Sequence, residues 1–200
     1  DSANFGVGVH WYNAVGSAYW NRRLKAGNWR TSISYSGFDN RISVDATAAG
    51  VKTKAGWASL DIKNRLSKGL RDDLILNASA DYTHYFYLPL QFTSQGSIGV
   101  LEMPMAKPMH YGEEASLGAD LRHTVNQYFA YHAGVHASIY HNDQTYFGID
   151  PRITFQFTPA ENHEIALHGG CYTQYFHKAG LTGGGLPTDF FLLADSTLKP

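Results

Sequence analysis

Apolar and polar residues alternate with a period of two along much of this chain. From residue 74, one set of alternate positions is apolar or aromatic: Leu74, Leu76, Ala78, Ala80 and Tyr82. The positions between them are polar: Asn77, Ser79, Asp81 and Thr83. Successive side chains of a β-strand point to opposite faces of its sheet, so this segment predicts a strand with one apolar and one polar face.

The same alternation returns in later segments. Its apolar members are Leu117, Ala119 and Leu121, then Phe129, Tyr131, Ala133, Val135, Ala137 and Ile139, then Ile153, Phe155 and Phe157. We predict eight strands, at about 11–22, 29–38, 56–66, 73–87, 113–123, 127–140, 150–158 and 164–176. Most of them have the roughly 9–11 residues that a tilted strand needs to cross a membrane, and several exceed the length usual in soluble sheets.

The links between the predicted strands alternate in length. Short links are expected at 23–28, 67–72, 124–126 and 159–163, and longer ones at 39–55, 88–112, 141–149 and 177–200. Short periplasmic turns that alternate with longer outer loops are typical of bacterial outer-membrane barrels. A soluble β-sandwich would also show alternation, but it does not explain this rhythm.

Aromatic residues gather near the strand ends that precede the longer links: Tyr82, Tyr85, Phe86 and Tyr87, and Tyr172, Tyr175 and Phe176. Rings with one apolar and one hydrated side suit a membrane interface. The pattern therefore predicts an all-β, antiparallel transmembrane β-barrel.

Closure and orientation follow from the solvent. Hydrocarbon cannot satisfy a free backbone group, so both edges of a crossing strand must be paired, and the sheet must close. The polar faces would line the interior, because a basic residue at the lipid midplane costs roughly 2–4 kcal/mol. Residues 177–200 read as a loop with no returning strand, so we expect residues 1–200 to be part of one β-barrel domain, a partial barrel of about eight strands from a larger one.

Composition narrows the classes of function. The formal charge is −1, and no clustered basic patch predicts a nucleic-acid partner. Cys171 is the single cysteine, which excludes an intrachain disulfide and a cysteine-based zinc site, and it reads as a small apolar residue on a strand. No apolar run approaches the roughly 18 residues of a membrane helix, so any membrane would be crossed by strands.

Sequence motifs in the C-terminal third carry a family resemblance. They are Asp-Pro-Arg-Ile-Thr-Phe at 150–155, a short turn, Gly-Gly-Cys-Tyr-Thr-Gln-Tyr at 169–175 within the segment 163–175, Gly-Leu-Pro-Thr-Asp-Phe at 185–190, and Leu-Lys-Pro at 198–200. This order resembles TonB-dependent receptors, which carry a Pro-Arg strand, a periplasmic turn, a Ser/Gly-Tyr strand with Gln near its outer end, and a loop that closes on Leu-Lys-Pro.

The N-terminal part is similar to one branch of the same family. His-Trp-Tyr-Asn at 10–13, Ser-Ala-Tyr-Trp-Asn-Arg at 17–22 and Ser-Tyr-Ser-Gly-Phe at 34–38 resemble its Trp-Gly-Asn, Arg-Trp-Asn-His and Tyr-Ser-x-Tyr patterns. Tyr12 stands where the pattern has Gly, and Arg23 stands where it has His.

The resemblance implies a 22-stranded barrel with an internal plug in the bacterial outer membrane. Such receptors import scarce ligands (iron chelates, haem, cobalamin, glycans or peptides) with energy delivered by TonB. The implied partners are the lipid bilayer, the TonB system through a plug domain, the imported ligand and a surface lipoprotein. No plug domain or TonB-contacting segment is recognisable in these 200 residues. A surface barrel enzyme or adhesin, and a soluble β-sandwich that binds carbohydrate, are the alternatives.

Two groups of residues are candidates for ligand binding in the outer loops. The first is Met103, Met105, Met109 and His110, a soft-ligand set that can capture Cu(I) or a haem edge, although Met is also a common flexible filler. The second is Phe190 and Phe191, which either stack on a ligand or lie at the interface.

Other candidate chemistry is weak. His132 and His136 would share a strand face about 13 Å apart, too far for one ion, so we interpret them as polar lining. Glu113 and Glu114 are adjacent and would point to opposite faces, and nothing defines a nucleophile. We therefore predict no catalytic residue, no metal ligand set and no cofactor.

Overall fold

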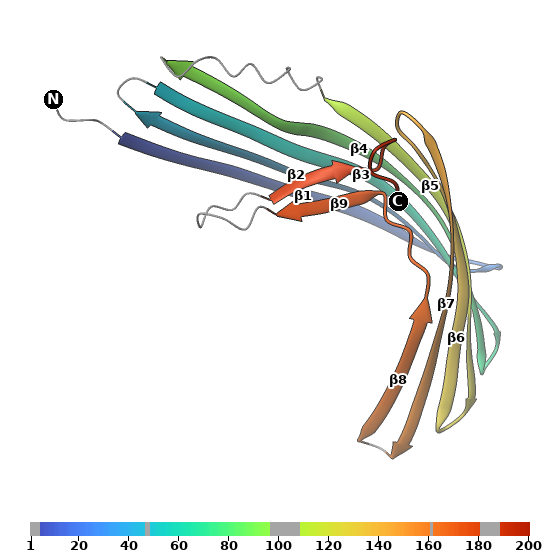
Figure 1. Ribbon diagram of the computed structural model, residues 1–200. Coiled ribbons are helices and arrows are strands. Elements are labelled where there is room, and N and C mark those ends of the chain that lie inside the picture. The colour runs from blue at the N-terminus through green and yellow to red at the C-terminus, as the bar shows by residue number, and fades with distance from the viewer. Residues whose placement is uncertain (1–4, 47–48, 97–108, 161, 181–188) are drawn as a thin grey trace.

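Eight antiparallel strands form one curved sheet in the computed structural model, which describes residues 5–46, 49–96, 109–160, 162–180 and 189–200 (Figure 1). The sheet follows chain order: β1 (Phe5–Leu24), β2 (Gly27–Ala46), β3 (Ala49–Arg71), β4 (Leu74–Gly96), β5 (His110–Asn126), β6 (Phe129–His141), β7 (Thr145–Ala160) and β8 (His163–Gly170). Strands β9 (Phe176–Gly180) and β10 (Asp189–Leu193) form a separate antiparallel pair, the C-terminal hairpin. The predicted all-β antiparallel class is confirmed, while β1 and β8 remain the two edges of an open sheet in the described part of the chain.

The eight predicted strands occur in the predicted order, but several boundaries were wrong. The predicted loop 39–55 is mostly strand, because β2 continues to Ala46 and β3 begins at Ala49. Residues 88–96 likewise continue β4. Strand β8 ends at Gly170 rather than near 176, so Cys171 lies just past a strand and is exposed. The segment 177–200, predicted as loop, contains most of β9 and all of β10.

Short turns join the strands at one end of the sheet. The link between β1 and β2 has Gly27 at its end with φ of 136°, and a Cβ there would overlap the carbonyl oxygen of Ser67. Only glycine adopts this conformation without strain, so the chain can reverse tightly at this point. Two-residue links follow at 72–73 and 127–128, as the sequence predicted within a few residues.

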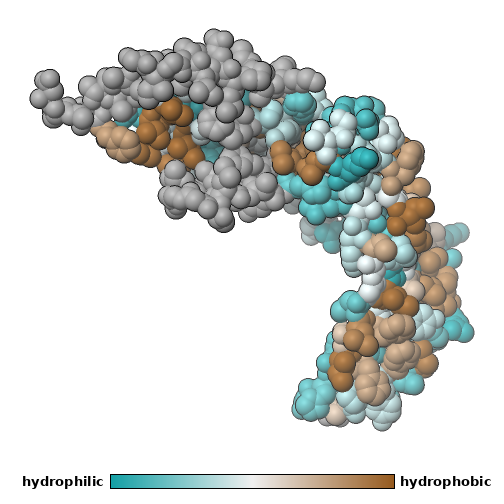
Figure 2. Space-filling model, viewed as in Figure 1, coloured by the Kyte–Doolittle hydropathy of each residue, from teal (hydrophilic) through white to brown (hydrophobic). Residues whose placement is uncertain are grey.

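The two faces of the sheet differ in polarity. The C-terminal hairpin lies against the concave side, here called the inner face, and the convex side is the outer face (Figure 1). Many outward-facing positions of β5–β8 carry large apolar side chains, and these are exposed. The exposed fractions are 67% for Leu117, 76% for Phe147, 72% for Ile149 and 67% for Leu167. Figure 2 shows hydrophobic residues along the outer edge of the curved sheet. The predicted separation of apolar from polar positions is therefore realised in space.

Polar side chains on the inner face form cross-strand pairs. Arg65 and Asp81 form an ion pair between β3 and β4. Asp120 of β5 accepts from Asn77 Nδ2 at 2.8 Å and lies 2.6 Å from His132 Nε2. These contacts satisfy the hydrogen-bonding groups of the polar side chains, which would find no partners on the apolar outer face.

The polarity of the faces reverses in the distal halves of β1–β3. Beyond Tyr12 and Tyr35, cross-strand partners on the outer face are polar or basic: His10, Arg41 and Lys54, then Gly8, Ser43 and Lys52. The inner face here carries Ile42 and Ala55, each only 8% exposed, and β10 lies against β3 and β4. This reversal explains why the segment 39–55 was predicted to be a loop. Its apolar positions lie on the inner face, which is the polar face elsewhere in the sheet.

Nowhere in the described ranges is there a helix with the length and hydropathy of a membrane span.

Candidate functional site

An aromatic cluster joins the C-terminal hairpin to the inner face of the sheet. Tyr140 of β6 is fully buried and stacks on Tyr175, with ring centroids 4.8 Å apart and planes 9° from parallel. Phe176 stacks on Tyr85 at 5.6 Å and packs against Trp57 at 5.3 Å. We call these five residues the inner-face cluster. Offset and tilted ring pairs of this kind stabilise by about 0.5–1.5 kcal/mol each beyond their buried area.

A buried carboxylate holds the segment that leads from β8 to the hairpin. Asp150 is 8% exposed, and its Oδ1 accepts from the backbone N–H of Thr173 at 3.0 Å and from its hydroxyl at 2.8 Å. His136 Nδ1 lies 3.9 Å from the other carboxylate oxygen. Two residues further along the segment, the hydroxyl groups of Tyr175 and Ser138 share a hydrogen bond of 2.9 Å. The chain therefore turns inward over the sheet instead of continuing along β7.

Carboxylates and hydroxyls continue this polar surface across neighbouring strands. Tyr85 donates to Glu114 Oε2 at 2.8 Å. Thr83 donates to Asp61 at 2.9 Å, and Ser59 donates to the same carboxylate at 3.1 Å. The inner face thus presents hydrogen-bond donors and acceptors suited to a polar solute.

A second set of contacts fixes the chain after β10. Tyr146 donates to the carbonyl oxygen of Asp195 at 2.6 Å, and Asn142 Nδ2 donates to the carbonyl of Ala194 at 3.4 Å. These two hydrogen bonds tie the residues after β10 to the end of β6 and the start of β7.

Of the residues predicted to bind a ligand in the first outer loop, the structure describes Met109 and His110. Met103 and Met105 lie outside the described residues. Met109 is 46% exposed and lies beside Tyr12 and Phe86 on the outer face, whereas His110 begins β5 opposite Tyr87 on the inner face, with ring centroids 6.2 Å apart. Met109 and His110 thus point to opposite faces and do not form one soft-ligand set.

Phe190 and Phe191 lie in β10, where their backbones pair with Ala179 and Lys178 of β9. The two residues therefore belong to the C-terminal hairpin and not to a loop tip.

The aromatic residues predicted for a membrane interface divide between the two faces. Tyr82 and Phe86 are on the outer face, as expected, but Tyr85 belongs to the inner-face cluster with Tyr175 and Phe176. Strand alternation places Tyr85 and Phe86 on opposite faces, and this sequence signal indicated that the aromatic residues would not all lie at one surface.

The paired histidines and glutamates behave as their spacing indicated. His132 contacts Asp120, and His136 lies near Asp150, so the two imidazoles have different partners. Glu114 faces inward to Tyr85, whereas Glu113 lies 3.4 Å from His84 on the outer face. In the described part of the chain, no three His, Cys, Asp or Glu side chains gather as a metal ion would require.

No family model, curated protein or solved structure matches the chain.

Proposed function

We propose that this chain forms part of the wall of an outer-membrane β-barrel that imports a scarce ligand, as TonB-dependent transporters do. The observation that carries the proposal is the exposed apolar outer face opposite a hydrogen-bonded polar inner face. Large apolar side chains such as Phe147 and Ile149, exposed to 76% and 72%, are favourable in contact with lipid tails and unfavourable in water. A continuous apolar surface of this kind is atypical of water-soluble monomers.

Several features support a closed barrel rather than a free sheet. Strands β1 and β8 each pair on one side only within the described residues, and an unpaired strand edge is not tolerated in hydrocarbon. Further strands must therefore complete the wall. A large barrel of the 22-stranded transporter type encloses enough space for a plug and for a hairpin on the inner face.

The reversal of polarity in β1–β3 supports strands that extend past the membrane. The apolar outer face ends near Tyr12 and Tyr35, and Arg41 and Lys54 follow on the same face. Barrel strands that project beyond the bilayer have water outside, so their apolar positions can only turn inward. The hairpin lies on this inward side, where β10 contacts β3 and β4.

The position of this hairpin and the family resemblance in 150–175 and 198–200 support an import role. A polar wall whose His132 and Asp120 side chains are 44% and 32% exposed, partly covered by a hairpin, offers hydrogen-bonding groups to a passing solute. The ligand classes of the proposal are iron chelates, haem, cobalamin, glycans and peptides, and energy would reach the barrel from TonB through a plug.

Ligand-dependent growth tests this function. Cells that produce the intact protein would be supplied with one ligand class at a time as the growth-limiting nutrient, with and without TonB. We expect growth on one class that disappears without TonB, and weaker uptake for Phe190→Ala/Phe191→Ala than for the matched inner-face change Ser34→Ala/Ser36→Ala. If growth on every ligand class were the same with and without TonB, the import role would be refuted. If the folded protein were recovered in a soluble fraction without detergent, the barrel itself would be refuted.

A further inference from the structure

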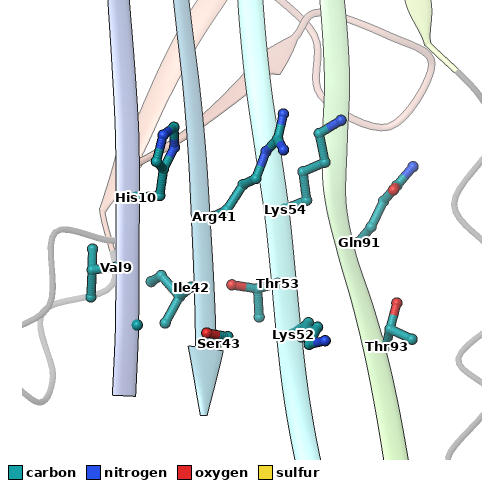
Figure 3. Close-up of a pocket in the computed structure, with 11 residues that line it drawn as sticks. Val9, His10, Arg41, Ile42, Ser43, Lys52, Thr53, Lys54, Gln91 and Thr93 are labelled. Atoms are coloured by element: carbon teal, nitrogen blue, oxygen red, sulfur yellow. The ribbon is translucent and has the colours of Figure 1, made fainter. Parts of the chain in front are cut away.

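A basic patch lies on the outer face just beyond the last aromatic residues of β1 and β2. His10, Arg41 and Lys54 are consecutive cross-strand partners on β1, β2 and β3, and Lys52 lies in the next row opposite Ser43. We call His10, Arg41, Lys52 and Lys54 the basic patch. Figure 3 shows His10, Arg41 and Lys54 side by side, with the hairpin behind the strands on the opposite face.

The side chains surround an open hollow of about 490 Å3, whose wall also includes Gln91 and Thr93 of β4. Amide and hydroxyl groups beside cations are the usual partners of phosphate oxygens. Asp39 lies 2.8 Å from Arg41 and offsets one charge. Among the described residues, no ion pair includes Lys52 or Lys54. The side chains around the hollow therefore carry a net positive charge.

The neighbours of the patch are ordered as the layers of a bilayer would require. Directly below it, a second hollow on the outer face is bordered by Lys54, Tyr12, Tyr35 and Phe86. Further down the same face, an apolar groove of about 610 Å3 is lined by small residues between large ones: Ala80, Ala115 and Ala137 with Ile62, Leu117 and Phe147. Apolar groove, aromatic ring and cation therefore follow one another along the outer surface, which matches the acyl chains, interface and headgroup of a phospholipid or phosphorylated glycolipid.

We propose that the basic patch binds the phosphate groups of a lipid headgroup in the leaflet that surrounds the barrel. The proposal rests on the outer-membrane function above, since it requires the outer face to contact lipid. Arg41 would supply a planar, bidentate donor, and Lys52 and Lys54 would act as compact charges. A soluble anion would make no use of the aromatic and apolar surfaces below the patch, so a lipid-borne phosphate fits the whole face better.

Binding to a defined lipid tests this site. The intact protein, purified in a neutral detergent, would be titrated with diphosphoryl lipid A and, separately, with the same lipid after removal of both phosphates. The test variant is Arg41→Gln/Lys52→Gln/Lys54→Gln. The matched control is Arg22→Gln/Arg23→Gln/Lys25→Gln, which removes the same charge at the short-turn end of β1. Resistance of each folded variant to dissociation in dodecyl sulfate verifies that the sheet is intact.

We expect the test variant to bind the phosphorylated lipid on the order of tenfold to a hundredfold more weakly, since each cation near an anionic membrane surface contributes to binding. The control should retain affinity, and the dephosphorylated lipid should bind both variants alike. Equal losses in test and control, or affinity that ignores the phosphates, would overturn the inference. Displacement of the lipid by millimolar inorganic phosphate would assign the patch to a free anion and would also overturn it. The proposed function fails separately, if the intact protein does not insert into lipid bilayers at all.

Discussion

The ring of Tyr140 lies directly over the backbone of Gly112 on the neighbouring strand. A Cβ at Gly112 would be 2.6 Å from the Tyr140 hydroxyl oxygen and 3.0 Å from the nearest ring carbon. Because Tyr140 is fully buried between this glycine and Tyr175, the ring has no free space into which to move. The absence of a side chain at residue 112 is therefore what permits the inner-face cluster to form.

Adding a methyl group tests this relationship. Gly112→Ala should lower the free energy of unfolding by about 1–3 kcal/mol, because overpacking forces neighbouring groups out of position. Gly16→Ala is the matched control, since a Cβ at Gly16 would meet nothing within 4 Å. Denaturant unfolding of the intact protein in lipid vesicles measures both. Equal stability of the two variants would show that Tyr140 does not depend on Gly112.

A charge placed on alternate residues of β7 distinguishes lipid from water. Ile153 faces outward, and its neighbour Thr154 faces inward beside His168. Ile153→Arg should cost roughly 2–4 kcal/mol near the membrane midplane. Thr154→Arg should cost no more than about 1 kcal/mol, the value of its one exposed hydrogen bond. Folding yield and unfolding in vesicles report the difference, and similar costs at both positions would argue against lipid on the outer face.

The link between β8 and the hairpin should depend on Asp150. Asp150→Ala leaves the N–H and the hydroxyl of Thr173 without their acceptor, at a cost of about 1–3 kcal/mol. Hydrogen exchange at the Thr173 amide should accelerate accordingly. Asp150→Asn retains a carbonyl oxygen and should keep most of the protection, while Asp143→Ala in the β6–β7 link should change nothing at Thr173. Unaltered exchange in Asp150→Ala would show that other contacts hold this segment.

The short turn between β3 and β4 should respond to acid. A hydrogen bond from His123, at 2.9 Å, is the main cause that lowers the pKa of Asp73 below its ordinary 3.8. Since the folded state favours the ionised carboxylate, this contribution to stability is complete above the ordinary value and is lost as pH falls through the lowered one. Exchange of turn amides should therefore rise only below about pH 4. His123→Gln should remove that part of the pH dependence, and an unchanged profile would contradict the pairing.

The sequence predicted the order of the strands because the membrane-facing segments obey one simple rule. From Leu117 to Leu121 and from Phe129 to Ile139, one face is uniformly apolar, and a period of two is easily recognised. The same rule separates Glu113 from Glu114 and places His132 and His136 on one face.

The rule did not extend to the distal parts of β2, β3 and β4. There the apolar positions, such as Ile42 and Ala55, lie on the inner face, the side on which the hairpin contacts β3 and β4, while Gly, Lys, Asn and Asp occupy many of the other positions. Such composition is typical of loops, and the partner that stabilises these strands lies far away in the sequence. For the same reason the inner-face cluster could not be predicted, since Tyr140 and Tyr175 meet only after the chain folds back after β8.

Site-directed spin labelling of β7 tests the account most directly. Single cysteines would replace each residue from Phe147 to Phe157 except Pro151, in a Cys171→Ser background of the intact protein in lipid vesicles, and collisions with oxygen and with a water-soluble nickel chelate would be compared. We predict that oxygen, which concentrates in lipid, reaches the odd positions, and that the nickel chelate reaches the even positions 152, 154 and 156. Gly148 and Asp150 also face inward but are buried, so neither reagent should reach them readily. Access of the nickel chelate to Ile149 and Ile153 as high as to Arg152 and Thr154 would contradict this prediction.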